Sequence, residues 1–183
     1  KACDVSQGQV IDGACKGGSH AGSVHDLTLA DIASLTDVFY IGGTKNGALF
    51  GEALIILNDE LKPDFRFMIK QKGAMLAKGW LLGIQFEELF QNNLFFDMAS
   101  HANAMAGKLR TALTDKGFSF AYDSQTNQLF PVFSNEMIAE LAKEFTFNMD
   151  KKIDETHSSI RLVTSWATTE DGVEEFIRFL KKY

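Results

Sequence analysis

The feature that most constrains this chain is a glycine-rich turn between two apolar segments. Residues 38–41 and 53–57 are rich in apolar, β-branched side chains, which is typical of buried strands. The turn between them, residues 42–51, carries Lys45. The ammonium of a lysine in a dry crevice must be neutralised, paired or consumed as an imine, so Lys45 is a candidate catalytic residue. The alternative is a surface hairpin turn with an exposed lysine, because glycine beside lysine is a weak signal.

A second candidate residue, Asp12, follows the short apolar run 9–11, which predicts a strand. Ligands of open α/β sheets bind outside the carboxyl ends of strands, so Asp12 and Lys45 are placed to share a crevice. A lysine amine and a carboxylate for the pyridine nitrogen are two groups that pyridoxal 5'-phosphate (PLP) requires in a protein. The small residues around Lys45 would let a flat ring approach the backbone.

The remaining pattern predicts further elements along the chain. Residues 15–25 predict a loop, and Asp26 or Thr28 is expected to cap a short helix through residues 31–35. From residue 63 to residue 116 the pattern becomes helical and predicts a long connector. The last section predicts strands at 118–121, 129–133 and 160–164, with helices at 135–144 and 170–182.

Composition excludes several classes of function. The net charge of -6 and the pI of about 5.2 argue against a nucleic-acid binder or a protein of anionic membrane surfaces. The sequence has no run of 18 apolar residues and no signal-peptide pattern, so we expect a soluble, cytoplasmic protein. Cys3 and Cys15 are expected as reduced thiols, with a single bridge between them as the alternative. No metal site is expected, because no ligand spacing occurs at the four histidines, His20, His25, His101 and His157.

One stretch, residues 26–57, resembles a known family. It contains Asp-Leu-Thr-Leu-Ala-Asp-Ile-Ala and then Phe-Tyr-Ile-Gly-Gly-Thr-Lys-Asn-Gly-Ala-Leu-Phe-Gly-Glu-Ala-Leu. These motifs are similar to those of low-specificity L-threonine aldolases, which are fold-type-I PLP-dependent enzymes. The likeness continues through residues 70–86 and 161–166, and residues 12–14 are similar to the family's Asp-Gly-Ala-Arg motif.

The resemblance implies an α/β fold of the PLP-dependent transferase type, also called the aspartate aminotransferase type. Residues 1–92 would be the C-terminal part of the PLP-binding large domain with its connecting helix. Residues 93–183 would be a small C-terminal α+β domain. A homodimer or homotetramer with sites at the subunit interface is also implied.

The resemblance also assigns roles to individual residues. Lys45 would hold PLP as a Schiff base, and Asp12 would pair with the pyridinium nitrogen. Ala14 and Thr44 would lie against the cofactor. Arg161 would bind the α-carboxylate of the substrate, because a guanidinium offers a planar bidentate fork.

Some charged residues have a plainer alternative. Without the resemblance, Arg161 would be read as a surface arginine of an edge strand. Arg66, Lys70 and Lys72 could contact the cofactor phosphate, although a solvated helix face is the favoured interpretation.

Two departures from the family pattern stand out. Cys15 takes the place of the motif's arginine and is followed by Lys16, which cannot reproduce the guanidinium fork. The family's phosphate-binding glycine loop and its ring-stacking histidine are not visible in the sequence, so an N-terminal section of the family is expected to be missing from it.

The implied activity is the cleavage of L-threonine, L-allo-threonine and related β-hydroxy-α-amino acids to glycine and an aldehyde. The residues do not identify the base that removes the hydroxyl proton. Two alternatives stay open: another PLP-dependent β-eliminating amino-acid lyase, and a catalytically inactive subunit with the same fold.

Overall fold

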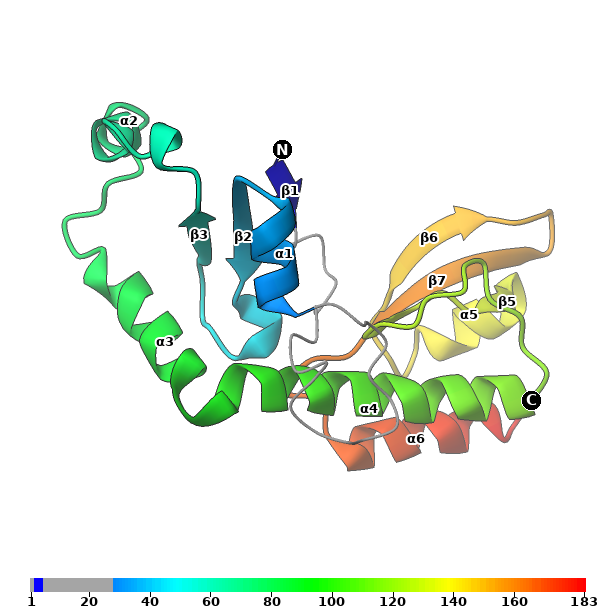
Figure 1. Ribbon diagram of the computed structural model, residues 1–183. Coiled ribbons are helices and arrows are strands. Elements are labelled where there is room, and N and C mark those ends of the chain that lie inside the picture. Colours follow the sequence, from blue (N-terminus) through cyan, green and yellow to red (C-terminus); the bar gives the residue numbers. More distant parts are fainter. Residues whose placement is uncertain (1, 5–27) are drawn as a thin grey trace. The chain divides into compact units, whose positions relative to one another are not determined.

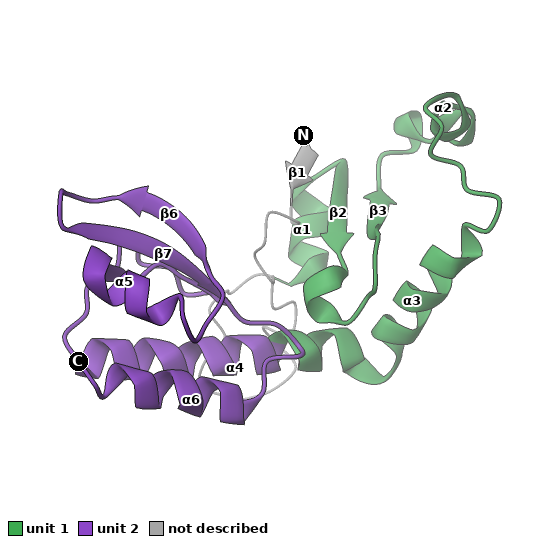
Figure 2. Ribbon diagram, turned by 180° about the vertical axis from the view of Figure 1, so that it is seen from behind, with its two compact units in different colours: residues 1–99 green, residues 100–183 purple. Residues whose placement is uncertain are grey.

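The computed structural model describes residues 2–4 and 28–183 (Figure 1). The chain divides into two compact units, Lys1–Ala99 and Ser100–Tyr183 (Figure 2). The expected strand at 9–11, the loop at 15–25, and Asp12 and Ala14 lie outside the described residues. The functional division into a cofactor-binding part up to residue 92 and a small domain after it stays a prediction.

The first unit contains a small sheet in the order β1-β2-β3 (Figure 1). Strand β1 (Ala2–Asp4) runs parallel to β2 (Val38–Gly42), and β2 runs antiparallel to β3 (Glu52–Ile56). The two strands predicted on either side of Lys45 are therefore confirmed. The prediction that both are buried is wrong for β3, because β3 lies at an edge of this sheet and Leu54 is 47% exposed.

Helix α1 (Leu29–Leu35) begins as its sequence predicts. The Thr28 hydroxyl accepts a hydrogen bond from the backbone N–H of Asp31 at 3.1 Å, and the Asp31 carboxylate accepts one from the backbone N–H of Thr28 at 2.7 Å. This reciprocal pair is a capping box, which satisfies backbone donors that the first turn leaves free. Thr28 is therefore the cap, as one of the two expectations stated.

The long helical section is confirmed, but it is divided. It contains α2 (Phe65–Gln71), α3 (Trp80–Phe90), a 3₁₀ turn η3 (Gln91–Asn93) and α4 (Leu94–Asp115). The break before α4 coincides with positive φ angles of 50° at Asn92 and 67° at Asn93. No helix in the described part of the chain is long and apolar enough to cross a membrane.

A compact apolar cluster closes the first unit. It joins residues of α1, β2, the turn after β2, α3 and the first turn of α4. Its buried members are Ile32, Phe39, Ile41, Ala48, Leu89 and Phe95. The Lys45 turn is consequently built onto a packed core.

The second unit is an antiparallel sheet covered by helices. Strand β7 (His157–Val163) lies between its partners and pairs with all three of them: β4 (Gln128–Leu129), β5 (Val132–Ser134) and β6 (Asn148–Lys152). Helices α4 and α6 (Glu170–Leu180) run side by side, and α5 (Asn135–Leu141) joins them in the core (Figures 1 and 2). The expected α+β layer is confirmed.

The strands of this unit differ from those predicted. Residues 118–121 form a single bridge, Phe120 to Pro131, in place of a strand. Strand β6 was not predicted, because its residues Asn-Met-Asp-Lys-Lys are polar and all exposed. Such a strand is recognised only through its partner, since it has no apolar face of its own.

The core of the second unit should respond strongly to loss of volume. Leu113 is 0% exposed, so Leu113→Ala is expected to lower the free energy of unfolding by about 2–5 kcal/mol. Leu76 is 56% exposed, and Leu76→Ala should change it by less than about 0.5 kcal/mol. Chemical denaturation of both variants measures the difference, and equal losses would contradict this assignment of the core.

Candidate functional site

Lys45 lies in a closed turn directly after β2. The turn contains a short 3₁₀ helix, η1 (Thr44–Asn46). The carbonyl of Gly43 accepts hydrogen bonds from the backbone N–H groups of Asn46 at 3.0 Å and Ala48 at 2.9 Å. The backbone around Lys45 is therefore fixed by its own hydrogen bonds at the carboxyl end of a central strand.

Two glycines allow this turn to pack tightly. Gly47 has a φ of 99°, a conformation that residues with a side chain rarely adopt, and a Cβ there would lie 2.8 Å from the Met98 sulfur. A Cβ at Gly43 would lie 2.6 Å from the Cβ of Ala48. Protein side chains fill the space at both glycines, so they serve the packing of the turn against its own unit.

The Lys45 side chain is half-buried, and Thr44 beside it is exposed. Within residues 2–4 and 28–183, no residue forms a hydrogen bond or an ion pair with the Lys45 amine. The turn is not a free surface hairpin, because its neighbours Asn46 and Ala48 are buried. A primary amine can form an imine with an aldehyde, which makes Lys45 a candidate to hold PLP.

A side chain of α3, Gln85, also holds this turn, and the sequence analysis did not predict it. The Gln85 side chain accepts a hydrogen bond from the backbone N–H of Leu49 at 2.7 Å. Its amide group donates to the carbonyl of Leu81 at 3.0 Å and to that of Phe50 at 3.4 Å. Gln85 thus connects the end of the turn, just before β3, to helix α3, and the hydrogen-bonded residue Leu49 lies 36 residues away in the sequence.

Arg161 lies on β7 in the second unit, opposite Asn148 of β6. Its side chain is exposed, and no residue in the described part of the chain pairs with its guanidinium. An unpaired guanidinium on a hydrogen-bonded strand is able to bind a carboxylate through two parallel hydrogen bonds. Lys45 and Thr44 belong to the first unit and Arg161 to the second, so their joint action on one ligand stays a prediction.

The carboxyl end of β7 is fixed by buried polar groups. The hydroxyl of Thr164 donates to the carbonyl of Ala102 at 2.7 Å, and the Asn127 amide donates to the carbonyl of Thr164 at 2.8 Å. Thr164 and Asn127 are 3% and 0% exposed. His101 is half-buried and hydrogen-bonds through Nε2 to the carbonyl of Thr168 at 2.7 Å.

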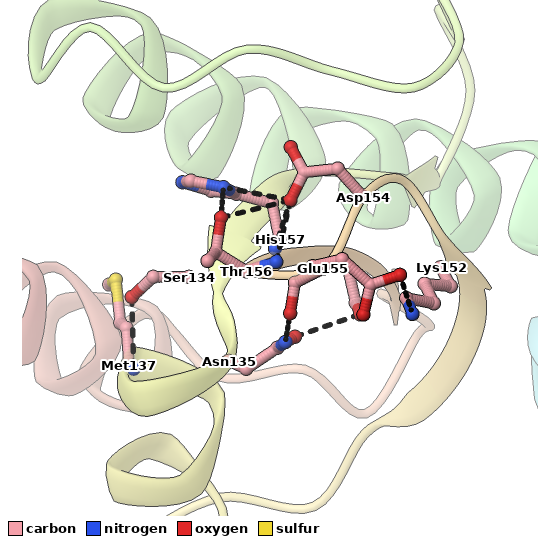
Figure 3. Close-up of polar contacts among 9 residues, drawn as sticks. Ser134, Asn135, Met137, Lys152, Asp154, Glu155, Thr156 and His157 are labelled. Carbon is pink, nitrogen blue, oxygen red and sulfur yellow. Dashed lines mark hydrogen bonds and ion pairs between the residues drawn. The ribbon is translucent and has the colours of Figure 1, made fainter.

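The amino end of β7 is fixed by a turn around Asp154 (Figure 3). The Asp154 carboxylate accepts hydrogen bonds from the backbone N–H of Thr156 at 2.7 Å, from that of His157 at 2.8 Å and from the Thr156 hydroxyl at 2.9 Å. The Asn135 amide donates to the carbonyl of Glu155 at 3.2 Å and so connects the turn to α5. The strand that carries Arg161 is thus held at both ends.

Three other charged residues are the remaining candidates for a contact with the cofactor phosphate. Arg66 and Lys70 lie on α2 and Lys72 follows it, and all three are exposed. This agrees with the favoured interpretation of a solvated helix face.

No group of three or more His, Cys, Asp or Glu side chains that could hold a metal ion occurs among the described residues.

Comparison with known proteins identifies the family. The solved structure of the Leishmania major threonine aldolase superposes with a TM-score of 0.85 and is 53% identical, over 88% of this chain and 47% of that one. The chain belongs to the threonine aldolase family. A low-specificity L-threonine aldolase of Pseudomonas aeruginosa is 31% identical over 150 residues, which are 79% of this chain and 41% of the relative.

More distant structures confirm the fold class. A serine palmitoyltransferase of Sphingomonas wittichii is 11% identical and superposes with a TM-score of 0.66 over 99% of this chain. This likeness supports the predicted fold-type-I architecture of the threonine aldolase family. No protein-family model matches the chain. The chain spans less than half the length of these relatives, 41% of the Pseudomonas protein and 47% of the Leishmania one.

The Asp154 turn generates a prediction about pH. The backbone N–H and hydroxyl of Thr156, together with the N–H of His157, lower the pKa of Asp154 from 3.8 to about 2. Because folding lowers the pKa of this carboxyl, its hydrogen bonds stabilise the turn fully at a pH above the ordinary pKa of the unfolded state. This stabilisation is lost as the pH falls through the lowered pKa of the folded state. The NMR signal of the Asp154 carboxyl carbon should therefore titrate with a midpoint near pH 2. Thr156→Val should raise the midpoint only in part, and a wild-type midpoint at the ordinary value would contradict the hydrogen bonds described.

Proposed function

We propose that this chain is part of a PLP-dependent aldolase that cleaves L-threonine, L-allo-threonine and related β-hydroxy-α-amino acids. The 53% identity to the Leishmania threonine aldolase carries the proposal. The half-buried Lys45, whose amine has no carboxylate partner among the described residues, supports it from the side of the chemistry.

The proposed reaction breaks one carbon–carbon bond. A base removes the proton of the β-hydroxyl, the Cα–Cβ bond breaks, and its electron pair remains on Cα. Cβ leaves as the carbonyl carbon of an aldehyde, and a proton added to Cα completes glycine. When bound, PLP supplies an aldehyde that captures amines and a protonated ring that withdraws electrons from the bond to be broken.

The residues of this chain would bind and orient the reacting groups. Lys45 supplies the amine that holds the cofactor, and Thr44 offers a hydroxyl beside it. Asp12 would keep a proton on the pyridine nitrogen, with Ala14 against the ring. Arg161 would grip the α-carboxylate, so that the bond to be broken stands perpendicular to the ring.

The nearest alternative is a β-eliminating lyase on the same scaffold. Both activities use a lysine, an aspartate and an arginine in similar roles, so the residues do not separate them. The products do: aldol cleavage of threonine gives glycine and acetaldehyde, whereas elimination gives ammonia and an oxo acid. A protein that binds PLP and yields neither set of products would be an inactive subunit, as the substitution of Cys15 for the family arginine suggests.

Self-association belongs to the same proposal. Several large apolar side chains of the first unit are exposed, among them Phe67 at 74% and Trp80 at 63%. Exposed apolar groups of this size favour an interface, and a homodimer or homotetramer with sites between subunits would cover them. A cytoplasmic location completes the proposal, in keeping with the substrate class.

Lys45 is open to direct test. Lys45→Ala should abolish threonine cleavage and remove the borohydride-stable PLP adduct, because the variant lacks the amine that forms the Schiff base. Peptide mass spectrometry locates the adduct. Lys78→Ala serves as a matched control, since Lys78 is exposed and lies outside the proposed site. A wild-type protein that binds no PLP, or an adduct on a different lysine, would overturn the proposal.

Arg161 should act on substrate binding. Arg161→Lys keeps the positive charge but loses the two parallel hydrogen bonds that a guanidinium donates to a carboxylate. The KM for threonine is therefore expected to rise roughly 10-fold to 100-fold, which corresponds to the loss of one charge-assisted hydrogen bond. PLP binding should be unchanged. Arg178→Lys, an exposed arginine of α6 in the same unit, is the control. An unchanged KM in Arg161→Lys would return Arg161 to a plain surface role.

A further inference from the structure

The residue after Lys45 is a buried asparagine with an incomplete set of partners. Asn46 is 2% exposed. Its Nδ2 donates a hydrogen bond to the backbone carbonyl of Phe95 in α4 at 3.3 Å. Its Oδ1 is buried and accepts no hydrogen bond in the described part of the chain. A buried acceptor without a partner is costly, so this residue calls for an explanation other than stability.

The Asn46 amide connects the turn to a distant and rigid element. The main-chain hydrogen bonds of the turn stay within residues 43–48, whereas the amide reaches a carbonyl 49 residues further along the chain. Phe95 is itself buried, and its ring stacks on Phe90 with centroids 4.9 Å apart. The hydrogen bond therefore ends on a part of α4 that the core holds in place.

The geometry of η1 turns this anchor into a constraint on Lys45. Successive side chains of a 3₁₀ helix point about 120° apart, because the helix has about three residues per turn. With Asn46 directed into the core toward α4, Lys45 points about 120° away from that direction. The burial pattern agrees, since Thr44 is exposed, Lys45 is half-buried and Asn46 is buried.

We propose that Asn46 is a positioning residue: its amide locks the 3₁₀ turn onto α4 and thereby sets the direction in which Lys45 presents its amine. The inference rests on the proposed function, in which Lys45 holds PLP. A leucine of similar size would fill the same space without an unpaired acceptor. The amide therefore contributes its directional hydrogen bond, which an apolar side chain cannot supply.

The test compares Asn46→Leu with the wild type in the full-length protein, with PLP as the probe. Asn46→Leu keeps the volume and removes the donor, so we expect thermal unfolding at a temperature equal to or above that of the wild type. The rate at which borohydride-stable PLP accumulates on Lys45 should fall by roughly tenfold to a hundredfold, as for a misplaced reacting group. The KM for threonine should stay within about twofold, because the amide does not touch the substrate.

Asn58→Ala is the matched control. The Asn58 amide donates to the Asp37 carboxylate at 3.1 Å, near the ends of β2 and β3 opposite to the Lys45 turn. Asn58→Ala also removes a side-chain amide hydrogen bond from the same unit, one that is partly buried, yet the adduct rate at Lys45 should not change.

Each outcome bears on a different claim. If the wild-type protein forms no PLP adduct, both the proposed function and this inference are wrong. A wild type that forms the adduct, with Asn46→Leu equally fast, overturns the inference alone. Asn46→Ala is the second variant: if neither variant folds, Asn46 is a structural residue and the positioning role is wrong.

Discussion

The antiparallel pairing of β2 with β3 is the constraint on which the Lys45 region depends. The pairing runs in register from Val38 with Ile56 to Gly42 with Glu52, so both ends of the intervening turn are fixed. The turn then has to close over a short distance, which requires the positive φ of Gly47 and the tight approach at Gly43. Side chains of α3 and α4 occupy the remaining space, and Lys45 is left half-buried directly after β2.

A similar principle governs β7 in the second unit. Side-chain hydrogen bonds to backbone groups hold both ends of this strand: the buried Asn127 and Thr164 at one end and Asp154 at the other. A strand fixed in this way holds its backbone, and with it the base of the Arg161 side chain, at low cost in entropy when a ligand binds. The long Arg161 side chain is exposed and keeps its own rotational freedom.

The sequence predicts the elements that have a local pattern, and it fails where the pattern is long-range. Apolar runs predict β2 and β3, and the start of α1 is predicted from a capping residue, with Asp26 and Thr28 as the two candidates. Strand β6 has no apolar face, so only its pairing with β7 reveals it. Asn46 and Gln85 act through partners 49 and 36 residues away, and no spacing in the sequence marks such contacts. Lys45 is a candidate from the glycine-rich turn itself, whereas the roles of Thr44 and Arg161 rest on the family resemblance and stay predictions.

Strand β6 has a consequence for how this protein avoids unwanted aggregation. An edge strand offers free backbone donors and acceptors, which can template the addition of another strand. In β6 all five side chains are exposed, Lys151 and Lys152 place positive charge on the edge, and the register shifts between Met149 and Lys151. A short, charged and irregular strand is a poor template, so the sheet of the second unit is protected on this side from growing into fibrils.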